Sequence, residues 1–186
     1  MLNNFKKLIN DQWTIWGVII ILLLGTISYW RVPSLFFQQD ELLGFGLIIE
    51  RGWEIIFRGF ASGETLHFIP LLNFFDSILF QAFSLNYFAY NAVGVLVHFL
   101  NGFLVYILAF LMIRRRGWAL LAALVFISSS SSSQLVMWPL VSIGMLSLTF
   151  ALLSWINLLR TKSLFTGIFL PFRIYFARLT CVEHLV

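Results

Sequence analysis

Two adjacent carboxylates, Asp40 and Glu41, are the side chains of this 186-residue chain best suited to acid–base chemistry. They begin the long polar connection that follows the first apolar run, and six of the eight acidic residues fall between Asp40 and Asp76. Charged groups are costly near lipid and mark functional sites there, and a carboxylate can accept a proton from an attacking hydroxyl. The pair therefore predicts a reaction site. Alternatively, it caps a helix that starts near Glu41, because acids favour the positive end of the helix dipole.

The same connection contains two further side chains, Arg58 and His67, that could face an anionic group. Arginine binds phosphate oxygens in a bidentate manner, so Arg58 is a candidate phosphate ligand. It could equally pair with Glu54, which precedes it by one helical turn. His67 could equally lie among lipid headgroups, and the sequence leaves both alternatives open.

The composition indicates an integral membrane protein, because 60% of the residues are hydrophobic, 18% are aromatic and only 11% are charged. The net charge of +4 does not indicate a nucleic-acid partner, since the basic residues form short clusters between apolar runs. The single cysteine, Cys181, excludes an intramolecular disulfide, and the sequence contains no CxxC or histidine-rich metal motif.

The apolar runs predict an all-α, polytopic membrane fold with about four or five transmembrane helices. The first run is longer than a secretory signal and no small-x-small cleavage site follows it, so we interpret it as an uncleaved helix. Basic clusters at residues 6–7, 114–116 and 160–162 share one side if the connection does not cross the membrane, which predicts a cytoplasmic amino terminus. The predicted helices cover residues 13–30, 87–113, 118–137 and 140–159, with a partial fifth within 163–186.

The connection over residues 31–86 is predicted to lie on the extracytoplasmic side. From Glu41 to Phe60 apolar residues recur at helical spacing, which predicts one or two amphipathic helices on the membrane surface. The segment 67–83 is apolar but carries Pro70, Asn73 and Asp76. We predict an interfacial or re-entrant helix there, because a crossing would move the arginine cluster at 114–116 to the outside.

Three polar residues, Asn91, His98 and Asn101, lie inside the predicted helix 87–113. Polar side chains are expensive within a membrane and mostly face protein or a cavity. The three-residue spacing of His98 and Asn101 puts both on one helical face. Hydrogen bonds to neighbouring helices are therefore expected, and a direct contact with substrate is the alternative.

The order of these features resembles the amino-terminal part of GT-C fold glycosyltransferases. It is most similar to the dolichyl-phosphate-mannose protein mannosyltransferase family and to bacterial relatives that use polyprenyl-phosphate sugars. The resemblance covers roughly residues 13–159, and Gln134 stands where many relatives have glutamate. The stretches that carry it are Asp40-Glu41, His67-Phe68-Ile69-Pro70-Leu71, Tyr90-Asn91 with His98 and Asn101, and Gln134-Leu135-Val136-Met137-Trp138.

The resemblance implies a hexosyltransferase that takes sugar from a lipid-phosphate donor to an unassigned acceptor outside the cytoplasm. Asp40 would be the general base, and Glu41 would orient the acceptor or help hold a divalent metal ion. Arg58 and His67 would face the donor phosphate. The implied location is the bacterial inner membrane, or the endoplasmic reticulum membrane in a eukaryote, with membrane lipids as further partners.

Family members usually continue with more helices, and the tail from residue 163 is interpreted as truncated or frameshifted. The alternative from another class is a small non-catalytic membrane protein, such as a transporter subunit or an assembly partner.

Overall fold

The structure is a computed structural model that describes residues 12–37, 39–58, 70–129, 136–137 and 139–161. The regular structure among these residues is entirely helical, with no strand, which confirms the all-α prediction. In chain order, the helices are α2 (Gln12–Tyr29), η1 (Val32–Ser34), α3 (Gln39–Arg51), η2 (Gly52–Glu54), α4 (Ile55–Arg58), α5 (Pro70–Phe83), α6 (Tyr87–Ile113), α7 (Arg116–Ser128) and α9 (Pro139–Thr161).

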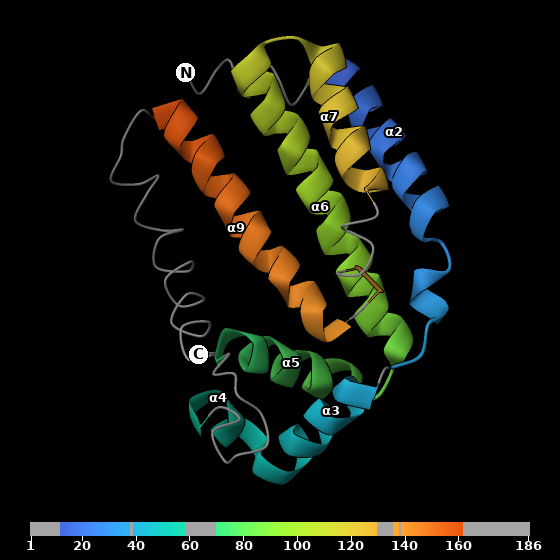
Figure 1. The fold of residues 1–186 in the computed structure, drawn as a ribbon, viewed down its shortest axis with the longest axis vertical. Helices are drawn as coiled ribbons and strands as arrows, with labels where there is room; N and C mark the ends of the chain where they lie inside the picture. Colours follow the sequence, from blue (N-terminus) through green and yellow to red (C-terminus); the bar gives the residue numbers. More distant parts are fainter. Residues whose placement is uncertain (1–11, 38, 59–69, 130–135, 138, 162–186) are drawn as a thin grey trace, which may run out of the picture.

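Helices α2, α6, α7 and α9 form the body of the molecule, with α6 at its centre (Figure 1). Helix α6 packs on α7, α9 and α2, and α2 also packs on α7. Close approach depends on glycines: a Cβ on Gly25 would lie 2.4 Å from Phe99, and one on Gly102 would lie 2.6 Å from Ile127. Small residues let apolar helices approach closely, as helices in membranes require.

Two segments are long and apolar enough to cross a membrane, Gln12–Ser34 and Tyr87–Ile113. Only 28% of the apolar window of the first and 33% of that of the second is buried. Their apolar side chains therefore face mostly outward. Shorter apolar helices cover Arg116–Ser128 and Met145–Arg160.

The arginine-bearing ends of the bundle lie together. Figure 1 shows the start of α2, the end of α6, the start of α7 and the end of α9 at the same end of the molecule. Arg114 ends α6 in a left-handed conformation, with φ 61°, and its backbone N–H donates to the Phe110 carbonyl. This turn brings Arg116 back to the end of the bundle that also contains Arg160.

Helix α7 is shorter than the sequence predicted. We expected a helix over 118–137, whereas α7 begins at Arg116 and ends at Ser128. The Ser128 hydroxyl donates to the Leu124 carbonyl over 2.8 Å, and Ser129 is extended, with ψ 127°. Serine side chains compete with the backbone for helical carbonyls in this way, so they favour a helix end. Residues 130–135 of the serine-rich stretch lie outside the described residues.

The connection between α2 and α6 folds across the end of the bundle opposite the arginines (Figure 1). Helix α5 lies across this end and contacts both α6 and α9. It is 14 residues long and is not among the candidate spans. Helix α3 contacts η2 and α4, and both of these contact α5. The four elements α3, η2, α4 and α5 therefore form one unit, here called the end unit.

Candidate functional site

Two buried carboxyl groups lie near each other inside the end unit. Glu41, in the first turn of α3, has no exposed surface, and Asp76, in the middle of α5, is 4% exposed. The two are near enough for the charge of Glu41 to act on Asp76. Residues 35 positions apart in the sequence therefore form a carboxyl pair that neither α3 nor α5 could form alone.

The surroundings of Asp76 favour its neutral form. Burial is the main cause and the negative charge of Glu41 the second, and together they hold the pKa of Asp76 well above its usual value of 3.8. Two carboxylates in a poorly solvated site cannot both ionise cheaply. A carboxyl group whose pKa is shifted in this way is a candidate proton donor or acceptor, although buried structural groups show such shifts as well.

Aromatic rings pack against one another where the end unit meets α6. Phe37 lies 4.8 Å from Phe45 and 5.4 Å from Tyr90 between ring centroids, and Phe45 lies 5.2 Å from Tyr90. Phe80 of α5 stacks on Phe45 at 5.7 Å. These contacts join α3 and the residues before it to α5 and to the first turn of α6.

Backbone carbonyls hold the end unit in position. Asn73 Nδ2 donates to the Ile55 carbonyl over 3.0 Å, which ties α5 to α4. Ser77 Oγ donates to the Asn73 carbonyl over 2.7 Å within α5. Asn91 Nδ2 of α6 donates to the Leu35 carbonyl over 2.7 Å, so the chain leading to α3 is fixed against α6. Leu35 lies between η1 and α3, so the Asn91 amide satisfies a carbonyl that is outside any helix.

The other residues predicted for the site lie around this unit or outside the described residues. Asp40 belongs to the first turn of α3, one residue before Glu41, and Arg58 is the last residue of α4. The side chains of both lie outside the described part of the chain, as does the whole of His67. The roles predicted for Asp40, Glu41, Arg58 and His67 therefore stay predictions.

Asn101 belongs to a second polar cluster, between α6 and α9. Its Nδ2 donates to the Met145 carbonyl over 2.9 Å, and Thr149 Oγ1 donates to its Oδ1 over 2.7 Å. Thr149 Oγ1 also lies 2.9 Å from the Met145 carbonyl oxygen. Asn101 has no exposed surface and Thr149 is 5% exposed, so this cluster joins two helices within an apolar core.

His98 faces the end of α7 instead. Its Nε2 lies 3.4 Å from the Ile127 carbonyl oxygen, to which the Tyr29 hydroxyl of α2 donates over 3.0 Å. The ring of His98 packs edge-on against Tyr29 at 5.0 Å and lies 5.1 Å from Phe126. His98 and Asn101 thus share the helix face that their spacing indicated, but each contacts a different helix. His98 follows Tyr90 by eight residues, or about 12 Å along α6, so this cluster is separate from the carboxyl pair.

The described residues contain no group of three or more histidine, cysteine, aspartate or glutamate side chains placed to hold a metal ion. The Tyr90 hydroxyl is buried without a hydrogen-bond partner and lies within the field of Asp76. It is a further polar group that can face a ligand or a proton at this place.

Sequence reasoning did not nominate Asp76 or Tyr90 as site residues. A signal for Asp76 was present, because it is the one acid within an apolar segment of α5. Tyr90 belongs to one of the stretches that carry the family resemblance, but nothing marked its side chain as a site residue, since tyrosine is common near helix ends in membranes.

Comparisons with protein families, curated proteins and solved structures find no match to this chain.

Proposed function

We propose that this chain is a membrane glycosyltransferase of the GT-C type, or part of one. In this proposal α2 and α6 span the bilayer, and α7 and α9 complete the bundle beside α6. A sugar passes from a polyprenyl- or dolichyl-phosphate donor to an acceptor on the extracytoplasmic side.

The observation that carries the proposal is that every acid among the described residues belongs to the connection at one end of the bundle, where Arg51 and Arg58 also lie. Arg114, Arg116 and Arg160 lie at one end, and the end unit that contains Asp40 and Glu41 lies at the other (Figure 1). Under the positive-inside rule the arginine end faces the cytoplasm and the end unit faces outward. An acidic pair at the start of the first extracytoplasmic connection is also the arrangement in the GT-C family that the sequence resembles.

The proposed reaction is a displacement at the anomeric carbon. The acceptor oxygen forms a bond to this carbon while the bond to the donor phosphate oxygen breaks, and the phosphate leaves with the electron pair. Asp40 takes the proton from the acceptor hydroxyl, and Arg58 and His67 offset the charge of the leaving phosphate. Glu41 is fully buried beside Asp76, so we assign it the role of positioning the first turn of α3.

The test is sugar transfer in membranes that contain the chain, with radiolabelled polyprenyl-phosphate mannose as the probe and label in the non-lipid fraction as the readout. Asp40→Asn should lower the transfer rate by about 10²–10⁴-fold, the usual contribution of a general base. Glu50→Gln is the matched control, because Glu50 is an exposed acid of the same helix. Equal rates for Asp40→Asn and the unchanged chain would remove Asp40 as the base, and no transfer above empty membranes would refute the proposal for this donor.

A further inference from the structure

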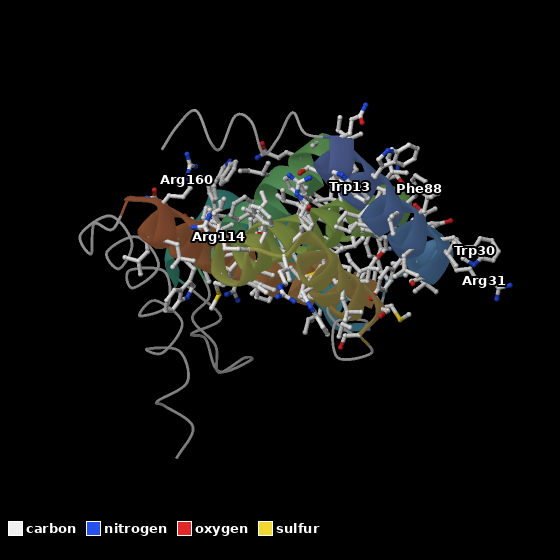
Figure 2. The ribbon with its side chains drawn as sticks, turned by 90° about the horizontal axis from the view of Figure 1, so that it is seen from above. Trp13, Trp30, Arg31, Phe88, Arg114 and Arg160 are labelled. Atoms are coloured by element: carbon white, nitrogen blue, oxygen red, sulfur yellow. The ribbon has the colours of Figure 1, made fainter. Side chains whose placement is uncertain are left out.

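The segment that leads from α2 into α3 is held by contacts with α6. Trp30 and Arg31 are both exposed, and Figure 2 shows their side chains projecting outward from the end of α2. Val32, the next residue, is buried in the core of the bundle, and its helix η1 contacts α6. The path from Val32 to the start of α3 at Gln39 therefore depends on α6.

Asn91 of α6 makes a hydrogen bond to this path. Its Nδ2 donates to the Leu35 carbonyl over 2.7 Å, and Asn91 is only 1% exposed. Leu35 is extended, with φ −72° and ψ 134°. The Oδ1 atom of the same amide is buried and has no hydrogen-bond partner among the residues that the structure describes. Removing the amide therefore breaks one described hydrogen bond and leaves the other described contacts of α6 in place.

Tyr90, the residue before Asn91, adds a second contact two positions further along the path. Its ring lies 5.4 Å from that of Phe37 between centroids, and Phe37 is buried. The Phe37 ring also lies 4.8 Å from that of Phe45, within α3. Adjacent residues of one helix thus hold the chain on both sides of Phe36, immediately before α3 begins.

Asp40 lies between these contacts and the buried Glu41. It is the second residue of α3, three positions after Phe37, and Glu41 has no exposed surface. A general base must lie within hydrogen-bond reach of the proton that it removes. A displacement of about 1 Å can lower a rate by about 10²-fold. The path into α3 is therefore able to control how well Asp40 is placed for reaction.

We propose that Asn91 is a positioning residue for the Asp40 base. Its hydrogen bond to the Leu35 carbonyl fixes the entry into α3, and with it the first turn that carries Asp40. The proposal rests on the proposed function, in which Asp40 takes the proton of the acceptor, and it gives Asn91 no contact with the substrate. Helix α6 contacts α2, α7 and α9, so the hydrogen bond ties the base to the centre of the bundle.

The first test compares kcat and KM of sugar transfer, with radiolabelled polyprenyl-phosphate mannose, for Asn91→Leu and Asn91→Ser. Leucine has a similar size but no amide, whereas the serine hydroxyl is shorter and can bond a carbonyl of its own helix. Each change should lower kcat by about 10–100-fold and leave KM within about twofold, because the base is displaced while substrate binding is kept. In an Asp40→Asn background the same changes should lower kcat by less than about twofold, since the base that Asn91 positions is gone.

Asn101→Leu is the matched control. It removes a buried amide of the same helix, but one that donates to the Met145 carbonyl of α9. Its kcat should stay within about twofold of that of the unchanged chain. A loss equal to that of Asn91→Leu would mean that general loosening of the bundle lowers the rate, and the proposal would be wrong. Equal losses with and without Asp40, or a raised KM at constant kcat, would also overturn it.

Hydrogen–deuterium exchange of the full chain in lipid nanodiscs tests the same contact without any sugar. The amides of residues 43–46 are the first in α3 with carbonyl partners inside the helix, and they exchange when its first turn opens. Asn91→Leu should raise their exchange rate by about 3–10-fold, the effect of one lost hydrogen bond, and Asn101→Leu should not. Unchanged exchange in Asn91→Leu overturns the proposal whether or not sugar is transferred. Faster exchange in a chain that transfers no sugar would keep the contact with α3 and refute the transferase proposal, and with it the role of Asp40.

Discussion

The hydroxyl of Thr149 is expected to couple α9 to α6 through Asn101. Replacing Thr149 with valine keeps the shape of the side chain but removes the hydrogen bond to Asn101 Oδ1, which is 2.7 Å long. The amide oxygen is then left buried, because Asn101 has no exposed surface. A buried acceptor that loses its donor costs about 1–3 kcal/mol, whereas hydrogen bonds between membrane helices contribute about 0.6 kcal/mol on average and about 1.7 at most.

We therefore expect Thr149→Val to lower the free energy of unfolding by about 1 kcal/mol and a double-mutant cycle with Asn101→Leu to give a coupling energy of about 0.6–1.7 kcal/mol. The assay is unfolding of the purified chain in mixed micelles by increasing dodecyl sulfate, followed by circular dichroism. Thr26→Val is the matched control, since Thr26 is an exposed threonine of α2, and it should change stability by less than about 0.5 kcal/mol. A coupling energy of zero, or equal effects of the two valine substitutions, would refute the assigned contact.

Two further predictions concern packing and charge. Gly102→Ala should destabilise the bundle by about 1–3 kcal/mol, because the new Cβ would lie 2.6 Å from Ile127 Cδ1, and a second change, Ile127→Val, should restore part of the loss in the same unfolding assay. If both variants are as stable as the unchanged chain, α6 and α7 are further apart than described. Asp76→Asn should gain stability relative to the unchanged chain as pH rises from about 5 to about 8. Because the pKa of Asp76 is raised, its carboxyl group keeps a proton in the folded chain at a pH where the unfolded chain, with the usual pKa of 3.8, has lost it. The contribution of this group to stability is therefore lost as pH rises through the folded pKa. A difference in unfolding free energy that is constant over this range would show that Asp76 ionises as it does in water.

The sequence predicted the all-α class and the positions of α2 and α6 because these helices depend on long apolar runs, which are local signals. It also predicted helices in the connection before α6. The end of α7 was not predictable in the same way, since a serine-rich stretch is compatible both with a continued helix and with a helix end. The outcome depends on whether serine hydroxyls or backbone N–H groups bind carbonyls such as that of Leu124.

The candidate site was predictable only in part. Adjacent acids are visible in the sequence, whereas the pairing of Glu41 with Asp76 depends on how α3 and α5 meet. Spacing identified a shared face for His98 and Asn101, but nothing in their spacing distinguishes α7 from α9 as the partner of each. Contacts between helices distant in sequence are set by packing, which no single helix specifies.

The carbonyl of Ile127 bears on the order in which the chain can assemble. Its hydrogen-bond donor Tyr29 and its neighbour His98 both come earlier in the chain than α7. During synthesis from the amino terminus, the side chains of α2 and α6 that contact this carbonyl are therefore made before α7. The Met145 carbonyl differs, because Asn101 precedes it while Thr149 follows it. The Ile127 carbonyl of α7 therefore finds its partners in helices made earlier, whereas the Met145 carbonyl also needs Thr149, which is made later in α9 itself.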